Sequence, residues 1–337
     1  MIKEVDIAIV GATTSVGETL LEILEERKFP VGQIFLLDNE ASSGARLEFS
    51  GYALKIGDIA SFDFSRVQLA FFVSTEAMSK QYAEKAAAEG CIVIDRTPAF
   101  RNDKDVALVI PEINDEALES INEKKIVSSP GCNSIQMLMA LKPVYDAVGI
   151  TRINVSTYQS VSGAGKRAAE ELASQTAALL NFRDVKSKVF PKQIAFNVLP
   201  QIGDLQDNGY SNEEMKLVWE TQKILNDTTV RVNATAVRVP VFIGHAACIN
   251  VETKEKISAT RVNELLQQTE GIELLTGTEW PTPVTEAANK DAVYVGRVRE
   301  DISCEKGINL WVTTDNMRKG AATNAVQIAE TLVKLYI

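Results

Sequence analysis

The 337-residue sequence has a single histidine, His245, and only four cysteines. A zinc site with several histidine ligands and a binuclear His-rich centre are therefore excluded, and we expect no bound metal. Any chemistry that requires an imidazole must use His245. The cysteines, at Cys91, Cys132, Cys248 and Cys304, form no CxxC pair and do not resemble a disulfide framework. Their use is typical of a reduced, cytoplasmic protein.

The sequence also lacks long apolar runs and an excess of positive charge. No stretch approaches the ~18 apolar residues that a membrane helix requires, so we expect no membrane partner. The start, MIKEVDIAIVGA, has no long apolar core followed by a small-residue cleavage site, so we expect no secretory signal. The formal net charge of −10 argues against a nucleic-acid partner, because such a protein needs a cationic face to neutralise phosphates.

Short apolar runs alternate with helical patterns through the first third of the chain. Strands that are apolar on both faces and separated by helices indicate a parallel sheet covered on both sides. This is the doubly wound pattern of nucleotide-binding domains. We expect strands at 5–10, 34–37, 69–73, 91–94, 106–110 and 126–127, and helices at 16–29 and 79–90.

The rest of the chain groups helices with mostly antiparallel strands, which indicates an α+β domain. Residues 320–336 form an amphipathic pattern, and we expect this helix to return to the first domain. The expected fold is α/β: a Rossmann-like doubly wound N-terminal domain plus an α+β domain. Strands are expected at 153–159, 230–242, 247–252 and 308–313, and helices at 164–180 and 212–225.

The segment Gly11–Gly17 lies between a predicted strand and a predicted helix. A dinucleotide pyrophosphate would meet the amides and the positive end of a helix at such a turn. Thr14 replaces the middle glycine of the fingerprint, which weakens the match, and the alternative is a plain strand–helix turn. The candidate cofactor contacts are Gly11, Thr13, Thr14, Ser15 and Val16.

Asp38 ends the next predicted strand, some 20 residues after the turn. An acidic residue at this place binds the ribose of NAD. The alternative is a solvated turn, because Asp38-Asn39-Glu40 has the composition of a loop.

Cys132 lies where a predicted strand ends and a predicted helix begins. A helix N-terminus lowers the pKa of a thiol and favours the nucleophilic thiolate. The alternative is a small buried apolar residue, as most free cysteines are. Cys91 and Cys248 lie in apolar strand patterns and fit that alternative better.

Several basic and acidic residues are further candidates. Arg238 and His245 bracket a short apolar strand, and the histidine is either structural or a partner of the thiolate. Glu213 and Lys216 share a face of a predicted helix, where a surface ion pair is the alternative. Arg101 either holds an anion or solvates a loop.

Four groups of segments, taken together, resemble the aspartate-semialdehyde dehydrogenase family. Their order and spacing match the family, and the resemblance covers nearly the whole chain. It implies a dinucleotide-binding domain of residues 1–131 with 317–337, and a catalytic and dimerisation domain of residues 132–316. The segments are Glu18–Pro30, Ser156–Lys166, Arg238–His245 with Val251–Ser258, and Asp315–Ala322.

The resemblance implies a role for each candidate. Cys132 matches the nucleophile, Gln159 matches the glutamine that orients the acyl group, and His245 matches the general acid/base. Arg238 matches the arginine that clamps the substrate carboxylate in bidentate fashion. Glu213 resembles the residue that holds the substrate amino group. The phosphate site is implied at Arg101 and Lys216, and further cofactor contacts at Ser42, Ser162, Gly163 and Asn316.

Departures from the family's pattern gather at the cofactor and phosphate loops. The family's Asn before the nucleophile and Ser or Thr after it are Gly131 and Asn133. Its Arg-Ser pair near the adenosine 2′-phosphate reads Ala41-Ser42, which together with Asp38 predicts weaker selectivity for NADP. The other departures are Thr14, Thr75-Glu-Ala77 in place of Ala-Gly-Gly, and Arg96-Thr-Pro98 in place of Asn-Thr-Ser.

Two functions are therefore expected to compete. The first is the reductive dephosphorylation of 4-aspartyl phosphate to aspartate semialdehyde by a homodimer, through a cysteine thioester and with NADP, or alternatively NAD, in lysine, threonine and methionine biosynthesis. The second is a catalytically altered or inactive paralogue that acts as a binding or regulatory protein. A reductase for N-acetylglutamyl phosphate is disfavoured by Glu213, Lys216 and Arg238.

Overall fold

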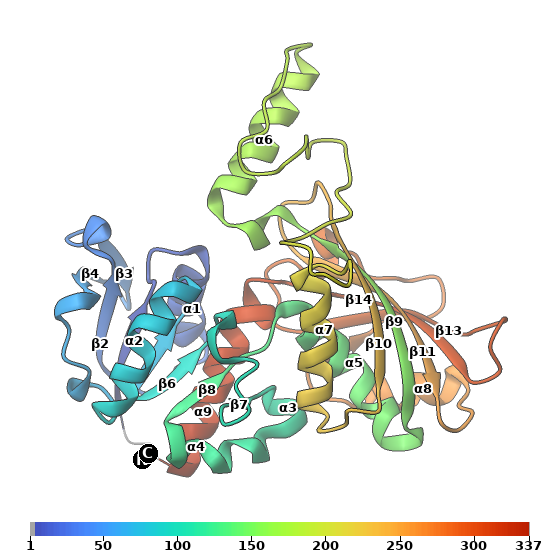
Figure 1. Ribbon diagram of the computed structural model, residues 1–337, viewed down its shortest axis with the longest axis horizontal. Coiled ribbons are helices and arrows are strands. Elements are labelled where there is room, and N and C mark those ends of the chain that lie inside the picture. Colours follow the sequence, from blue (N-terminus) through green and yellow to red (C-terminus); the bar gives the residue numbers. More distant parts are fainter. Residues whose placement is uncertain (1–3, 337) are drawn as a thin grey trace. The chain divides into compact units, whose positions relative to one another are not determined.

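The computed structural model describes residues 4–336 and divides the chain into two compact units (Figure 1). Unit 1 comprises Met1–Gly131 and Ala321–Ile337, and unit 2 comprises Cys132–Gly320. Residues 317–320, which the sequence places with the first domain, belong to unit 2. None of the helices within residues 4–336 is long and apolar enough to cross a membrane.

Unit 1 alternates strands and helices along the chain. Its elements are β1 (Val5–Val10), α1 (Ser15–Glu26), β2 (Val31–Asp38), η1 (Glu40–Ser42), β3 (Arg46–Phe49), β4 (Tyr52–Asp58), η2 (Ile59–Ser61), η3 (Phe64–Arg66), β5 (Leu69–Phe72), α2 (Glu76–Ala88), β6 (Ile92–Asp95), η4 (Pro98–Phe100), β7 (Ala107–Leu108), α3 (Pro111–Asn114), η5 (Asp115–Ser120), α4 (Ile121–Lys124), β8 (Ile126–Ser128) and α9 (Asn324–Tyr336).

The strands of unit 1 form an eight-stranded sheet with the order β3-β4-β2-β1-β5-β6-β8-β7. Neighbouring strands are parallel except in the β3–β4 hairpin. The strand order reverses at β1, which lies between β2 and β5, and open α/β sheets bind their ligands at such a point. The doubly wound prediction is confirmed, although the β3–β4 hairpin is absent from it.

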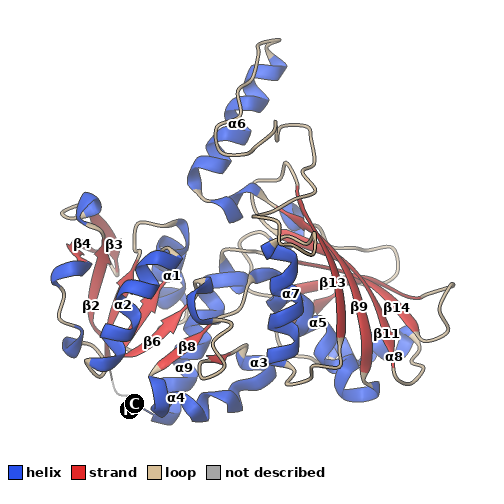
Figure 2. Cartoon of the chain, viewed as in Figure 1, coloured by secondary structure: helices blue, strands red, loops and turns tan. Residues whose placement is uncertain are grey.

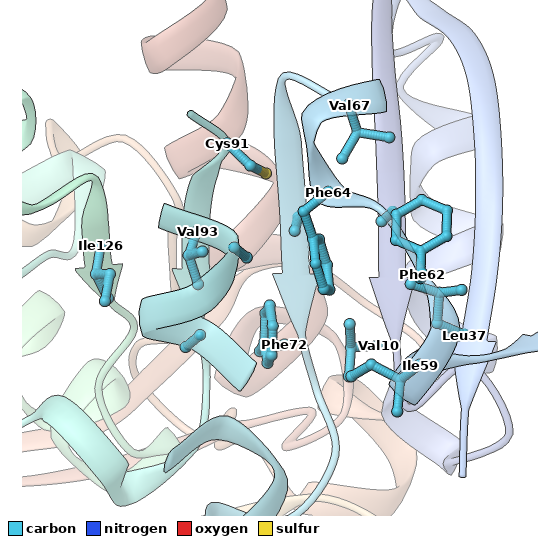
Figure 3. Packing of buried hydrophobic residues seen from close by; sticks show 14 of the residues in the cluster. Val10, Leu37, Ile59, Phe62, Phe64, Val67, Phe72, Cys91, Val93 and Ile126 are labelled. Atoms are coloured by element: carbon cyan, nitrogen blue, oxygen red, sulfur yellow. The ribbon is translucent and has the colours of Figure 1, made fainter. Parts of the chain in front are cut away.

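A buried cluster fills one face of this sheet (Figure 3). Val10, Phe72 and Val93 contribute to it from three adjacent strands, because alternate residues of a strand point to the same face. The rings of Phe62 and Phe64 meet edge to face at 5.1 Å. Burial of each such aromatic side chain stabilises the folded state by about 1.5–3 kcal/mol. The cluster therefore stabilises the packing of the strands whose ends carry the cofactor turn.

The last helix, α9, packs against α1 and β6 of unit 1, as the sequence predicts. Arg27 holds Glu330 in a bidentate pair, with Nε 2.8 Å from Oε1 and Nη2 2.6 Å from Oε2. The amide nitrogen of Asn324 donates to the carbonyl oxygen of Val109 at 3.0 Å. The helix begins at Asn324 rather than at residue 320, because residues 318–323 form a π-helical turn.

Unit 2 combines one sheet with helices. Its elements are α5 (Cys132–Val148), β9 (Ile150–Gln159), η6 (Val161–Ala164), α6 (Lys166–Leu180), α7 (Asn212–Ile224), β10 (Arg231–Arg238), β11 (His245–Thr253), α8 (Ala259–Gln267), β12 (Ile272–Leu274), η7 (Pro283–Ala287), β13 (Val293–Glu300), β14 (Gly307–Thr314) and the start of η8 (Arg318–Thr323).

The sheet of unit 2 has the order β10-β9-β11-β14-β13-β12, and Figure 2 shows its strands in red beside one another. The pairs β9–β10 and β12–β13 are parallel and the other neighbours are antiparallel, so the sheet is mixed. Helices α5, α7 and α8 pack against it, which confirms the α+β prediction. The expected strand 230–242 begins at Arg231 and ends at Arg238, two residues before Pro240.

Candidate active site and cofactor turn

The turn between β1 and α1 depends on two glycines. Gly11 has a φ of +90°, and a Cβ there would lie 2.6 Å from Cβ of Ser74. A Cβ at Gly17 would lie 2.8 Å from Cα of Ala12. The helix therefore starts close against the strand, and the N–H groups of Ser15 and Val16, which lack acceptors within the helix, are available to an anion. This backbone fits a dinucleotide pyrophosphate.

Thr14 occupies the place of the middle glycine and caps α1. Its φ of −73° and ψ of 156° are extended, so the backbone there does not require glycine. The hydroxyl oxygen accepts from the N–H of Gly17 at 3.0 Å and lies 2.8 Å from the carbonyl oxygen of Gly11, to which it donates. The side chain is directed into the turn itself, so Thr14 is compatible with the cofactor turn.

Asp38 ends β2 and is buried, with 4% of its surface exposed. Its Oδ1 accepts from the N–H of Asn39 at 2.8 Å, and its Oδ2 accepts from the hydroxyl of Thr13. Asp38 itself is therefore not solvated, although Asn39 and Glu40 of the following turn are exposed. Ala41 is exposed and Ser42 half-buried in the turn that follows, so no cation stands at the position where the family carries one.

Arg101 is 7% exposed, so the alternative that it solvates a loop is wrong. Its Nη2 donates to the carbonyl oxygen of Arg96 at 2.5 Å. Arg101 also acts on Asp95, whose carboxyl accepts hydrogen bonds from Ser79 and Thr97. Burial raises the pKa of Asp95 to about 6, and the charge of Arg101 opposes that shift.

Cys132 is the first residue of α5, at the N-terminus of the helix as the sequence predicts. Its side chain is 8% exposed, and a Cβ added at Gly320 would overlap its Sγ. Cys91 is fully buried, and burial raises the pKa of its thiol to about 12. Cys248 is half-buried on β11, so the expectation that it is an interior residue is wrong.

His245 is the first residue of β11 and is 4% exposed. The N–H of Ser160 donates to its Nδ1 at 3.2 Å. A Cβ added at Gly163 would lie 3.1 Å from both Nε2 of His245 and Nη1 of Arg238. The structure therefore brings the histidine and the arginine together at Gly163.

Ser162 and Asn316, both predicted as cofactor contacts, lie at the same place. The amide nitrogen of Asn316 donates to Oγ of Ser162 at 3.0 Å. Its Oδ1 accepts from the N–H of Gly244 at 2.9 Å, directly before the histidine. Three of the cofactor residues that the resemblance implies, Ser162, Gly163 and Asn316, are thus neighbours of His245.

Arg238 is the last residue of β10 and is 6% exposed. Its Nη1 donates to the carbonyl oxygen of Ser160 at 2.7 Å. Burial lowers the pKa of Arg238, and the negative charge of Glu213 opposes that shift. Arginine stays protonated at neutral pH even so, and the buried cation is suited to a substrate carboxylate.

The carboxylate of Glu213 gathers three side chains. Its Oε1 lies 3.3 Å from the amide nitrogen of Gln159 and 3.3 Å from that of Asn133, and both amides donate to it. Its Oε2 accepts from Nζ of Lys216 at 3.1 Å. The pair of Glu213 and Lys216 is partly buried, so the surface ion pair alone does not describe it.

Sequence reasoning missed two residues of this site. Ser160 lies inside the segment Ser156–Lys166 that carries the family resemblance, but its contacts depend on which strands are neighbours. Gly320 lies inside Asp315–Ala322, where nothing in the sequence marks it as a neighbour of the thiol. Arg101 belongs to unit 1, and the other predicted substrate residues belong to unit 2.

Both units match known families. Residues 6–121 match the family described as semialdehyde dehydrogenase, NAD binding domain, and residues 141–319 match semialdehyde dehydrogenase, dimerisation domain. Aspartate-semialdehyde dehydrogenase 2 of Vibrio cholerae is 54% identical over 336 residues, which cover 100% of each chain. The aspartate-semialdehyde dehydrogenase of Legionella pneumophila is 48% identical over 340 residues, covering 100% of this chain and 98% of the relative.

Solved structures agree with these matches. The crystal structure of aspartate semialdehyde dehydrogenase II from Vibrio cholerae has a TM-score of 0.98 and 54% identity, and the match covers 99% of this chain and 100% of that one. The matched domains and relatives identify an oxidoreductase of amino-acid biosynthesis with a nicotinamide cofactor. The chain belongs to the aspartate-semialdehyde dehydrogenase family.

Proposed function

We propose that the chain reduces 4-aspartyl phosphate to aspartate semialdehyde and phosphate through a thioester on Cys132, with the NADP cofactor in its reduced form, NADPH, as the hydride donor and NADH as a second donor. The product serves lysine, threonine and methionine biosynthesis in the cytoplasm. The observation that carries the proposal is the meeting of His245 and Arg238 at Gly163. A Vibrio cholerae relative, described in complex with ASA, supports the choice of substrate.

In the proposed mechanism, the thiolate of Cys132 attacks the acyl carbon of the substrate. A carbon–sulfur bond forms, the carbon–oxygen bond to phosphate breaks, and phosphate leaves with the electron pair, which gives the thioester. The position of Cys132 at the start of α5 favours the thiolate, and the first-turn amides are available to the developing oxyanion.

When bound, the reduced nicotinamide supplies the hydride that converts the thioester to the aldehyde level. His245 carries a proton on Nε2, because its Nδ1 accepts from the N–H of Ser160. It donates that proton to the oxygen that gains negative charge. It takes the proton back when the carbon–sulfur bond breaks and Cys132 leaves as the thiolate.

The remaining side chains orient the substrate in this proposal. Arg238 clamps the substrate carboxylate, and Glu213 holds the amino group. Gln159, whose amide is held by Glu213, orients the acyl group. Lys216 and Arg101 are the proposed phosphate ligands.

Unit 1 is the proposed dinucleotide-binding domain and unit 2 the proposed catalytic and dimerisation domain. The cofactor residues in unit 1 are Gly11, Thr13, Thr14, Ser15, Val16 and Ser42. A homodimer is supported by the sheet of unit 2, where the ring centroids of Tyr158 and Trp311 lie 5.5 Å apart. Trp311 and Trp280 line a hollow of about 410 Å³ on this sheet. A second copy of the chain is the proposed occupant of this face.

An enzymatic assay tests the proposal. Purified protein receives aspartate semialdehyde, phosphate and either NADP or NAD, and the absorbance of the reduced cofactor is followed. We expect turnover with both cofactors that depends on phosphate. No turnover with either cofactor, under conditions where a known family member works, would contradict the proposal and favour the altered paralogue.

A further inference from the structure

Ser160 approaches the ring of His245 with two different groups. Its backbone N–H lies 3.2 Å from Nδ1, and its hydroxyl oxygen lies 3.1 Å from the same atom. A backbone N–H donates only, so Nδ1 must offer its lone pair to it. The neutral ring therefore carries its proton on Nε2, the nitrogen that faces Gly163 and Arg238.

The hydroxyl of Ser160 has a second acceptor for its own proton. Oδ1 of Asn316 lies 3.2 Å from Oγ of Ser160. The same Oδ1 accepts from the N–H of Gly244 at 2.9 Å, which identifies it as the oxygen of the amide. Ser160 and Asn316 are 0% and 2% exposed, so these bonds are removed from bulk water. A hydroxyl that donates to Asn316 keeps a lone pair for Nδ1 of His245.

We propose that Ser160 is a positioning residue that sets the protonation of His245. Its N–H selects the neutral form with the proton on Nε2. Its hydroxyl oxygen accepts from Nδ1–H once the ring takes up a second proton, while the hydroxyl itself still donates to Oδ1 of Asn316. The N–H of Ser160 thus favours the neutral ring with its proton on Nε2, which is the form that donates in the proposed reaction. The hydroxyl of Ser160 favours the charged ring, which carries a proton on both nitrogens.

Other ionisable groups lie on the elements that pack near β11. Arg238 meets the ring at Gly163. Cys132 and Glu213 belong to α5 and α7, the helices on this part of the sheet. Asp315 follows β14, and its carboxylate accepts from the N–H groups of Asn289, Met317 and Arg318. Removing the Ser160 hydroxyl leaves all of these in place, so a change in the titration of His245 reports on the hydroxyl.

The single histidine of the chain makes a direct measurement possible. The full chain is labelled with ¹³C,¹⁵N-histidine and purified without a polyhistidine tag, so every imidazole signal comes from His245. We expect ¹⁵N shifts of the neutral form in which Nε2 carries the proton. Shifts that place the proton of the neutral ring on Nδ1 would overturn the proposal without any variant.

The variant Ser160→Ala keeps the N–H and removes the hydroxyl. We expect the midpoint of the His245 titration to move to lower pH by about one unit, because a hydrogen bond to the charged ring is lost. Thr313→Val is the matched control, because the Thr313 hydroxyl donates to the backbone oxygen of His245 at 2.8 Å and not to its ring. Its midpoint should equal that of the wild type. An unchanged or higher midpoint in Ser160→Ala would overturn the proposal.

The role of Ser160 in turnover rests on the proposed function. A second measurement distinguishes a failure of this role from a failure of the proposed function. In Ser160→Ala, the acidic limb of the pH–rate profile should move in the same direction and by the same amount as the titration midpoint. A limb that stays in place while the midpoint moves would overturn the positioning role in catalysis. If no turnover is found at all, the proposed function fails and the titration still decides whether Ser160 sets the protonation of His245.

Discussion

The carbonyl oxygen of Ser160 accepts a hydrogen bond of 2.7 Å from Nη1 of Arg238, and the N–H of the same residue donates to Nδ1 of His245. One residue therefore holds a side chain from each of two strands. Gln159, the last residue of β9, pairs with Arg238 on one side and with His245 on the other. Because β9 lies between β10 and β11, the register of the sheet brings the predicted clamp and the predicted acid/base together.

The first prediction concerns the clamp. Arg238→Lys keeps the charge but loses the paired donors that match a carboxylate. A hydrogen bond to a charged group contributes ~1.5–3 kcal/mol, so we expect the KM for aspartate semialdehyde to rise by ~10–100-fold. Steady-state kinetics with varied aspartate semialdehyde measures this KM. Arg231→Lys, at the exposed start of the same strand, is the control and should leave KM unchanged. An unchanged KM in Arg238→Lys would remove the arginine from the substrate site.

The second prediction concerns the nucleophile. Cys132→Ser should lower kcat by ~10³-fold or more, because a serine hydroxyl remains protonated where a thiolate forms. Cys304→Ser is matched in chemistry, since this half-buried cysteine lies between β13 and β14, outside the proposed site. It should keep wild-type activity. Equal losses in the two variants would mean that the sulfur of Cys132 has no special part in the reaction.

The third prediction concerns the space around the thiol. Gly320→Ala places a methyl group where Sγ of Cys132 lies, so the thiol has to move. We expect alkylation of Cys132 by iodoacetamide, followed by peptide mass spectrometry, to slow by roughly tenfold, about the effect of 1.4 kcal/mol on a barrier. In Gly57→Ala the new methyl group meets Cδ2 of Leu37 at 3.4 Å, an ordinary contact, and the rate should stay the same. A wild-type rate in Gly320→Ala would contradict the close packing.

The fourth prediction concerns the choice between NADP and NAD. Asp38 repels a 2′-phosphate, and the exposed Ala41 offers no opposing charge. Ala41→Arg should therefore raise kcat/KM for NADP relative to NAD by roughly tenfold, as expected for one charge-assisted bond. Ala53→Arg adds the same charge at an exposed position of β4 and should not alter the ratio. A fall in the NADP/NAD ratio of Ala41→Arg would place the 2′-phosphate elsewhere.

Local patterns of sequence predicted the elements that carry the cofactor turn and the thiol. The apolar run of β1 and the start of α5 at Cys132 depend on neighbours in the sequence. The hairpin of β3 and β4 was missed because its residues are largely exposed and give no continuous apolar signal. The pattern of residues 230–242 was also misleading, because the strand ends at Arg238, two residues before Pro240.

Contacts between distant segments were beyond the reach of these patterns. Ser160 and His245 are separated by 85 residues, and Asn133 and Glu213 by 80. Only the strand order and the packing of α5 against α7 bring them together. Asn133, which departs from the family's pattern, proved to be a donor to Glu213, a contact that its position in the sequence does not indicate.

The fifth prediction concerns Asp95, the buried last residue of β6. Burial raises its pKa from 3.8 to about 6 in the folded protein. The folded state therefore binds a proton more tightly than the unfolded state. The resulting stabilisation is fully present below about pH 4 and is lost as the pH rises through about 6, a change of about 3 kcal/mol in total.

Asp95→Asn removes this titration. Lowering the pH from 7.5 to 5 should stabilise the wild type by about 1.4 kcal/mol more than the variant, since pH 5 lies one unit below the pKa. In scanning calorimetry this corresponds to a difference of ~2–4 °C in the pH-induced change of Tm. Asp58→Asn, at the end of β4 in the same sheet, is the matched control and should change with pH as the wild type does. If the Tm of Asp95→Asn changes between the two pH values as that of the wild type does, the carboxyl of Asp95 is already ionised at pH 5. Burial would then not raise its pKa as predicted.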